Sequence, residues 1–316
     1  MPSPSATFVT SEPSFGTCVA RRRARAVASL SEPVRILIAG YGFVGRTLGR
    51  RLSERGHKVW GIRRSHVAFP EDVEVVAADL SRPLDTALLS EAPDYVVYLL
   101  SSDERSDAAY RQARVEGLDN LIEALGVFDA PPLRLLYASS TGVYPHSDGN
   151  WVDEDTPVIP GSVEGSRLLE GEARARACPF PSTVIRFAGI YGSGRIRLLR
   201  KVARGEPTCS EGPPVYSNRI HVEDCAGVLE HLMQLEHPRE LYVASDDEPV
   251  DRCELARWLA TALGVPPANP LPREEAHADR SNKRCSSRRL KESGYRFLYP
   301  TFREGYGKII RQGFDI

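Results

Sequence analysis

The sequence predicts an α/β protein with a doubly wound parallel sheet and a smaller, helix-rich C-terminal lobe. Two observations predict this architecture. Short apolar, β-branched runs alternate with longer segments of helical periodicity, as in βαβ units. A glycine-rich turn also joins the first apolar run directly to the first amphipathic segment. The length of 316 residues exceeds the usual size of one domain, so a second lobe is expected.

Seven apolar runs are predicted to be the strands of the sheet. They are Arg35–Ala39, Lys58–Ile62, Val73–Ala78, Tyr95–Leu100, Leu133–Ala138, Thr183–Phe187 and Leu241–Ala244. Between the strands, apolar residues recur at helical spacing, and each set forms one face for packing on the sheet. These residues are Val44, Leu48 and Leu52 in one helix, and Leu118, Leu121, Ile122 and Leu125 in another. Gly56 and Gly126 follow these helices, where left-handed caps are predicted.

The glycine turn after the first strand predicts a Rossmann fold that binds a dinucleotide. Gly40 permits the tight turn, Gly42 lets the backbone approach a pyrophosphate, and Gly45 lets helix and strand pack closely. The backbone N–H groups that follow, including those of Phe43 and Val44, stand at the positive end of a helix and are predicted to face the phosphates.

The end of the second strand favours NADP over NAD as the cofactor. An Asp or Glu usually binds the ribose 2′-hydroxyl of NAD there, whereas this strand ends in Arg63 and Arg64. Guanidinium groups match phosphate oxygens, although these arginines are alternatively only solvated charges. After the third strand, Asp79 and Leu80 are predicted to line the adenine site, with helix capping as the alternative for Asp79.

Composition narrows the classes of partner. The formal charge of −1 gives no reason to expect a nucleic acid, so a small molecule is the expected ligand. The six cysteines contain no C-x-x-C pair, which argues against a zinc site or a redox dithiol, and they are predicted to be reduced thiols. No apolar run approaches the roughly 18 residues of a membrane helix.

Residues 1–33 differ in amino-acid composition from the rest of the chain. They are rich in Pro, Ser, Thr and Arg, and we exclude them from the fold as a disordered or targeting extension. A cytoplasmic protein is expected, with an organelle as the alternative if this extension is a transit peptide. Residues 34–192 plus about 219–247 are predicted to form the dinucleotide-binding domain. Residues from about 193 to 218 and from 250 to 316 would form the small substrate lobe.

Three further motifs carry a family resemblance. The segments are Ala138–Tyr144 (ASSTGVY) after the fifth strand, Ile185–Gly192 (IRFAGIYG) after the sixth, and Arg219–Asp224 (RIHVED). With these motifs the sequence resembles the extended or atypical short-chain dehydrogenase/reductases, often called NAD-dependent epimerase/dehydratases. The resemblance runs from about Val34 to the C-terminus.

The resemblance implies a nicotinamide pocket at the ends of strands four to six. The implied lining residues are Leu99, Leu100, Phe187 and Ala188. It also implies that Ser140 hydrogen-bonds the reacting oxygen, with Thr141 as the fallback and a loop that caps its own backbone as the structural alternative. The implied reaction is hydride transfer to or from a hydroxyl or carbonyl of a small, sugar-like substrate.

The catalytic pair of that family is missing. Its Tyr-x-x-x-Lys helix reads Val163 at the tyrosine position and Arg167 at the lysine position. Valine cannot transfer a proton, and arginine hardly titrates, although it could still bind the nicotinamide ribose. We therefore predict Tyr144 as a replacement acid/base. The alternative is a catalytically silent NADP-binding regulator or scaffold.

The sequence leaves the roles of two further segments open. The basic run Lys283–Arg289 would either contact an anionic substrate or form a solvated loop face, and the second reading is slightly favoured. The helix at Asp107–Leu125 corresponds to one that often forms dimer interfaces in the resembled family, so a homodimer is a possible assembly. His221 is interpreted as part of a structural segment, and no metal site is predicted.

Overall fold

The structure, a computed structural model, describes residues 32–65, 73–272 and 281–315. Nearly all of the predicted N-terminal extension therefore lies outside the described residues. A seven-stranded parallel sheet in the order β11-β7-β5-β4-β1-β2-β3 forms its centre. Its strands are β1 (Arg35–Ala39), β2 (Lys58–Arg63), β3 (Glu74–Ala77), β4 (Tyr95–Tyr98), β5 (Arg134–Ser140), β7 (Ser182–Phe187) and β11 (Leu241–Ala244).

The predicted fold class and all seven predicted strands are confirmed, with boundaries that shift by at most two residues. One of the two predicted helix caps is wrong. Gly56 is left-handed with φ of 81°, but Gly126 has φ of −67°. Gly126 stays right-handed because the chain continues in turns, where the N–H of Val127 donates to the Ala124 carbonyl.

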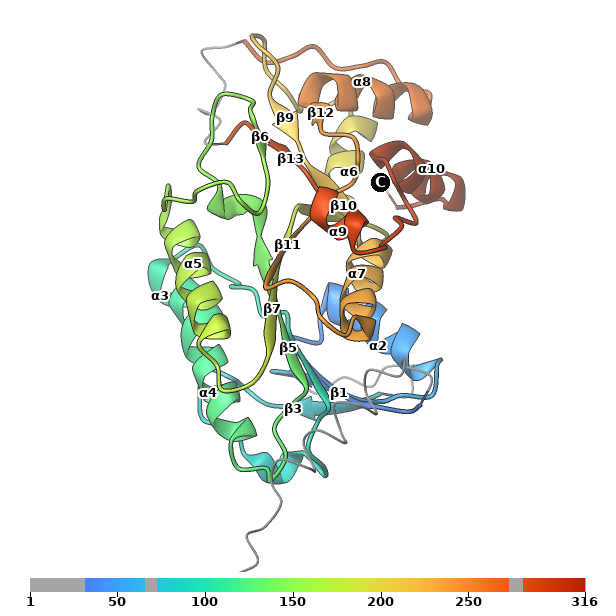
Figure 1. Cartoon of the computed structure of the whole chain (residues 1–316). Helices are drawn as coiled ribbons and strands as arrows, with labels where there is room; N and C mark the ends of the chain where they lie inside the picture. The colour runs from blue at the N-terminus through green and yellow to red at the C-terminus, as the bar shows by residue number, and fades with distance from the viewer. Residues whose placement is uncertain (1–31, 66–72, 273–280, 316) are drawn as a thin grey trace, which may run out of the picture.

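Helices cover both faces of the sheet, as Figure 1 shows. On one face lie α2 (Phe43–Ser53) and α7 (Val222–Gln234). On the other face lie α3 (Asp107–Arg111), α4 (Gly117–Leu125) and α5 (Val163–Arg176), with a wide helical turn at Gln112–Glu116 between α3 and α4. Strand β1 explains this two-sided burial, because Ile36 and Ile38 pack into one core and Leu37 and Ala39 into the other.

The remaining elements surround the carboxyl ends of the strands and extend beyond them (Figure 1). The helices are α6 (Arg197–Ala203), α8 (Arg252–Leu263), α9 (Arg288–Glu292) and α10 (Phe302–Gln312). The short strands are β6 (Trp151–Val152), β8 (Gly189–Tyr191), β9 (Tyr216–Ser217), β10 (Arg219–His221), β12 (Val250–Asp251) and β13 (Arg284–Cys285), and single 3-10 turns occur at Thr86–Leu88 and Thr141–Val143. Helices α6, α8 and α10 share a separate apolar core, although the exact domain boundaries stay a prediction.

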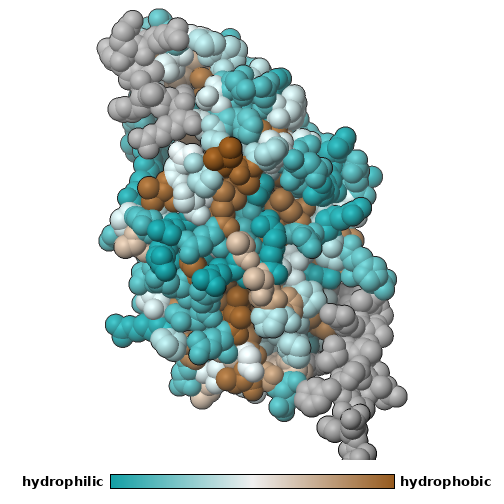
Figure 2. Space-filling model, turned by 60° about the vertical axis from the view of Figure 1, so that its left-hand side comes forward, coloured by the Kyte–Doolittle hydropathy of each residue, from teal (hydrophilic) through white to brown (hydrophobic). Residues whose placement is uncertain are grey.

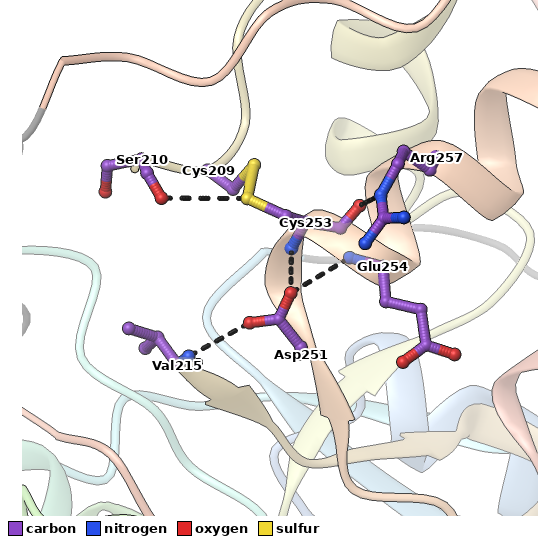
Figure 3. Close-up of a disulfide and its surroundings, with 7 residues drawn as sticks. All are labelled: Cys209, Ser210, Val215, Asp251, Cys253, Glu254 and Arg257. Carbon is purple, nitrogen blue, oxygen red and sulfur yellow. Dashed lines mark hydrogen bonds between the residues drawn. A yellow bond between two sulfur atoms is a disulfide. The ribbon is translucent and has the colours of Figure 1, made fainter. Parts of the chain in front are cut away.

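A disulfide corrects one expectation from the sequence. Cys209 and Cys253 are bonded, so the prediction of six reduced thiols is wrong for this pair (Figure 3). The two cysteines are 44 positions apart, and the antiparallel pairing of β9 with β12 brings their segments together. Asp251 orders the same corner by accepting hydrogen bonds from the N–H groups of Cys253 and Val215. Only the tertiary fold makes the two cysteines neighbours.

The surface that carries the helices α3, α4 and α5 is mostly hydrophilic, with a narrow hydrophobic band running down its middle (Figure 2). The possible homodimer through these helices stays a prediction. Among residues 32–65, 73–272 and 281–315, no helix has both the length and the apolar character needed to cross a membrane.

A buried ion pair joins α5 to β7, the strand next to the edge strand β11. The Nε and Nη2 atoms of Arg186 on β7 lie 2.9 and 2.7 Å from the two carboxylate oxygens of Glu172, and Glu172 is 0% exposed. Ser139 on β5 donates to the same carboxylate at 2.6 Å, and Arg176 lies 3.1 Å from it. Burial raises the pKa of Glu172, but hydrogen bonds and charge from Arg186 outweigh this effect and lower it overall. The carboxylate is therefore ionised and fully paired.

Replacing Glu172 with Gln should destabilise the fold strongly, since it leaves the Arg186 guanidinium buried without a counter-charge. Losing one partner of a buried pair typically costs about 3–5 kcal/mol of unfolding free energy. Urea unfolding followed by circular dichroism measures this loss. Glu170→Gln, which removes a partly exposed partner of Arg167 on the same helix, is the control and should cost about 1 kcal/mol or less. Equal losses in the two variants would contradict the importance of the buried pair.

Candidate functional site

A cavity of about 950 Å³ opens at the carboxyl ends of β1, β2 and β4. Eight of the residues that the sequence predicted to bind the cofactor line it, namely Gly40, Gly42, Arg63, Arg64, Asp79, Leu80, Leu99 and Leu100. The other predicted contacts, Val44, Gly45, Phe187 and Ala188, do not line this cavity, and Phe43 lines a smaller one formed by α2, α7 and α10. The cavity therefore brings together residues predicted for the adenosine and phosphate half of the site and two of the four predicted for the nicotinamide pocket, Leu99 and Leu100.

The glycine turn forms the inner wall of this cavity, and each glycine has a physical reason. A Cβ on Gly40 would lie 2.8 Å from the Leu99 carbonyl carbon, and one on Gly45 would lie 2.6 Å from the Gly40 oxygen. A Cβ on Gly42, in contrast, would meet only the Gly40 oxygen, at 4.0 Å. Packing of the chain thus requires Gly40 and Gly45, whereas Gly42 leaves open space of the kind that a pyrophosphate needs.

The amino end of α2 is left open for an anion. Its N-cap is Gly42, which has no side chain to accept from the first turn, and this turn contains no acidic residue. The first bond that closes the helix runs from the Arg46 N–H to the Gly42 carbonyl. Among the described residues, the N–H groups of Phe43, Val44 and Gly45 are therefore available to phosphate oxygens.

Charged residues at the outer end of the cavity include both predicted arginines. Arg63 and Arg64 line it at the end of β2, and Arg64 forms an ion pair with Asp103. Asp79 lines the cavity too, and its carboxylate accepts from the Ser81 N–H at 3.0 Å, which lowers the pKa of Asp79. This bond closes a turn rather than beginning a helix, so the helix-capping alternative for Asp79 is wrong.

Ser140 ends β5 with a hydroxyl that can still act as a donor. Its oxygen accepts from the Gly142 N–H at 3.0 Å, and its hydrogen has no acceptor among the described residues. The fallback residue Thr141 is 7% exposed and hydrogen-bonds the Cys285 thiol, whose pKa burial raises to about 12. Ser140 is thus better placed than Thr141 to meet a ligand at this edge of the sheet.

The geometry of Tyr144 does not fit the predicted acid/base role. Its ring is fully buried, and its hydroxyl donates to the Asp153 carbonyl at 2.6 Å and accepts from Arg186 Nη1 at 2.9 Å. Burial raises the pKa of this phenol well above its usual range. The sequence pointed to the nearest phenol along the chain, but the fold turns it inward to continue the network of Glu172 and Arg186.

The start of α5 carries Val163 and Arg167, the residues that stand at the expected tyrosine and lysine positions. Val163 is its first residue and is 54% exposed, and Ser162 caps the helix by accepting from the Gly165 N–H. Arg167 makes ion pairs with Asp107 on α3 at 2.7 Å and with Glu170 at 2.6 Å. Its guanidinium therefore links two helices, which leaves its predicted ribose contact a proposal.

His221 has the structural role expected from its motif. It ends β10 and caps α7, because its Nδ1 accepts from the Glu223 N–H at 3.3 Å. Burial, followed by the charge of Lys308, lowers the pKa of His221 to about 4, so the ring is neutral at physiological pH. Asp224 accepts from the N–H groups of Leu298 and Tyr299, which fastens the C-terminal segment to α7.

The structure also reveals Lys283, to which the sequence assigned no individual role. It is 5% exposed and lies against the loop that follows Ser140, since its Nζ donates to the Tyr144 carbonyl at 3.0 Å. The basic run around it was visible in the sequence, but nothing in that run distinguishes a buried lysine from its solvated neighbours.

These features define a dinucleotide-binding α/β protein with a modified short-chain dehydrogenase site. Comparison with known proteins agrees, because the model of the NAD dependent epimerase/dehydratase family matches residues 36–244. The chain belongs to this family, and NAD(P) is the class of cofactor that the family binds.

Several relatives match along most of their length. "Epimerase family protein SDR39U1" of Bos taurus is 27% identical over 303 residues, which cover 88% of this chain and 100% of the relative. A solved structure from Methylobacillus flagellatus, with a proposed assignment as an NAD-dependent epimerase/dehydratase, is 37% identical with a TM-score of 0.73, covering 89% of this chain and 99% of that one. Human SDR39U1, solved with NADPH, has the same fold at 22% identity and a TM-score of 0.72, covering 88% and 99% of the two chains.

Tyr144→Phe tests whether this phenol is structural. Because the change removes a buried hydroxyl that serves both Asp153 and Arg186, it should lower the unfolding free energy by about 1–3 kcal/mol. Cofactor affinity, measured by calorimetry on the folded variant, should stay unchanged. Loss of stability below about 0.5 kcal/mol would contradict this role. Tyr110→Phe, on the half-buried surface of α3, is the control.

Proposed function

We propose that this protein binds NADP(H) and catalyses hydride transfer to or from a hydroxyl or carbonyl group of a small molecule. The observation that carries the proposal is the open amino end of α2 beside two arginines at the end of β2. Three amides without a partner in the described chain suit a pyrophosphate. Two guanidinium groups, where an NAD-binding protein usually has an acid, suit a 2′-phosphate.

The residues of the chain fit such a cofactor in shape as well as charge. Gly42 leaves room for the pyrophosphate, Asp79 offers an acceptor for the adenine amino group, and Leu80 and Leu100 supply apolar walls. When bound, the cofactor would supply or accept the hydride. Support also comes from human SDR39U1, whose structure contains NADPH.

Ser140 is the residue that we assign to the reacting oxygen. It ends β5 at the carboxyl edge of the sheet, where ligands of open α/β folds bind. Its free hydroxyl hydrogen can donate to a carbonyl oxygen and polarise it toward hydride attack. The phenol of Tyr144 does not move the proton in this proposal, because its hydroxyl is buried and engaged.

A second candidate is favoured by the start of α5. Val163 is exposed where related enzymes have their proton-transferring tyrosine, and Arg167 is held in ion pairs. Both features agree with a protein that binds NADP(H) without turnover and whose cofactor state regulates a partner. The two candidates share the cofactor site and differ only in the chemistry beside it.

Arg63→Ala and Arg64→Ala test the choice of cofactor. Each should weaken NADPH binding about 10-fold to 100-fold, since a charge-assisted contact to phosphate contributes about 1.5–3 kcal/mol, and should leave NADH binding nearly unchanged. Isothermal titration calorimetry measures both affinities. Arg82→Ala, an exposed arginine nearby that does not line the cavity, is the control. Equal or tighter binding of NADH than NADPH by the unaltered protein would overturn the assignment.

The double variant Val163→Tyr with Arg167→Lys separates the two candidate functions. If the protein has its own mechanism, NADPH oxidation with generic carbonyl compounds should not increase. A clear gain of turnover would instead identify a silent protein in which the missing pair has been restored. Val163 is exposed, so a tyrosine fits there without repacking, and Arg167→Lys alone is the control for the lost ion pairs.

A further inference from the structure

The smaller cavity formed by α2, α7 and α10 has a volume of about 380 Å³ and shares no lining residue with the cofactor cavity. It begins at Phe43, whose ring lines it and whose N–H group is available to the cofactor from the amino end of α2. Small-molecule sites commonly measure about 300–1,000 Å³, so a compact ligand would fill this cavity. Ser140 does not line it, which makes it a separate space from the proposed site of hydride transfer.

Two helices line the cavity with positively charged side chains. On α2, Arg46 and Arg50 stand one turn apart on the same face, and on α10 Lys308 stands one turn before Gln312. Glu223 is the only acid among the described residues that line the cavity. Three cations and one carboxylate leave an excess of two positive charges. An anion is therefore the kind of ligand that the charge of the cavity favours.

The carboxylate of Glu223 is compensated by arginines of α2. It lies 3.3 Å from Arg50 and 3.6 Å from Arg51. In the part of the chain that the structure describes, no ion pair joins Glu223 to Lys308. The one acid of the cavity therefore does not neutralise the cation that α10 contributes.

Lys308 lines the cavity with an ammonium group that meets only a neutral partner. Its side chain is half-buried, and its Nζ donates to the Tyr299 hydroxyl at 2.6 Å. The Nζ also lies 5.3 Å from the centre of the Tyr299 ring, which orients the ammonium group without removing its charge. An ammonium group has three N–H donors, so two have no acceptor among the described residues and can serve a ligand.

His221 adds a donor to the same cavity. The residue is 4% exposed, and its Nδ1 accepts from the Glu223 N–H, so the neutral ring carries its hydrogen on Nε2. This Nε2–H has no acceptor within residues 32–65, 73–272 and 281–315. Burial, and then the charge of Lys308, lowers the pKa of His221, which shows that the two side chains are close enough to interact. A ligand that brings acceptor oxygens would satisfy both groups.

From these observations we infer that the cavity lined by Arg46, His221 and Lys308 binds the phosphate group of a second small molecule, next to the cofactor site. A phosphate monoester carries a charge of about −1.5 to −2 at neutral pH and has three acceptor oxygens. Its charge matches the positive excess of the cavity, and its oxygens match the N–H donors of Lys308 and His221. A single carboxylate, with one charge and two oxygens, would match less well. The inference goes beyond the proposed function, because this cavity shares only Phe43 with the residues assigned to the cofactor.

A phosphorus NMR titration of the full chain, saturated with NADP⁺, tests the second cavity. Saturation with NADP⁺ fills the open amino end of α2, so inorganic phosphate added afterwards reports on another site. Phosphate should bind, and Lys308→Gln should weaken this binding about tenfold or more, since charged hydrogen bonds are lost. Lys308→Arg, which keeps the charge, should retain most of the affinity. Arg311→Gln removes an exposed cation of α10 outside the cavity, so this control should change the affinity by less than about twofold.

Absence of phosphate binding to the NADP⁺-saturated protein, or equal affinities in Lys308→Gln and the unaltered protein, would overturn the inference. Malonate, a dianion with two carboxylates, tests the class of anion, and malonate binding as tight as that of phosphate would overturn the phosphate assignment. If thermal unfolding shows that Lys308→Gln is misfolded, Arg46→Gln decides by the same criterion. Failure of the unaltered protein to bind NADP⁺ would overturn the proposed function. Lys308→Gln and Arg311→Gln would then be compared on the cofactor-free protein, with the same outcomes deciding on the cavity.

Discussion

The buried ion pair between Glu172 and Arg186 is the interaction on which the geometry of the site depends. It joins α5 to β7, and through Ser139 and Tyr144 it reaches both ends of the loop that contains Ser140. A paired charge in a water-free interior tolerates little displacement, because each lost bond leaves an unsatisfied group. Hydrogen bonds from Ser139 to Glu172 and from Arg186 to Tyr144 therefore hold both ends of the loop, in addition to packing.

The same network explains why the protein departs from the usual catalytic arrangement without losing its fold. The polar groups of Tyr144 and Arg186 form hydrogen bonds within the protein, and Arg167 forms an ion pair with Asp107 on α3. Val163 contributes little to packing, because its side chain is exposed at the first turn of α5. The cofactor half of the site and the chemical half are thus independent. The cofactor half depends on backbone geometry at α2 and on side chains that follow β2 and β3, and the other half depends on side chains of β5, α5 and β7.

The C-terminal segment places a buried lysine next to the loop after β5. Lys283 reaches that loop from more than a hundred residues away, held by Asn218 and by the pairing of β13 with β6. The small elements around β6 and β13 therefore determine where Lys283 lies relative to the central sheet.

The sequence by itself determined the sheet and the cofactor turn, because both depend on local patterns. Apolar runs specify strands buried on both faces, and the spacing of Gly40, Gly42 and Gly45 specifies a backbone shape within six residues. Only the tertiary structure decided which polar side chains face a ligand. The inward turn of Tyr144, the burial of Lys283 and the bond between Cys209 and Cys253 each depend on segments far apart in the chain, and no local pattern records those distances.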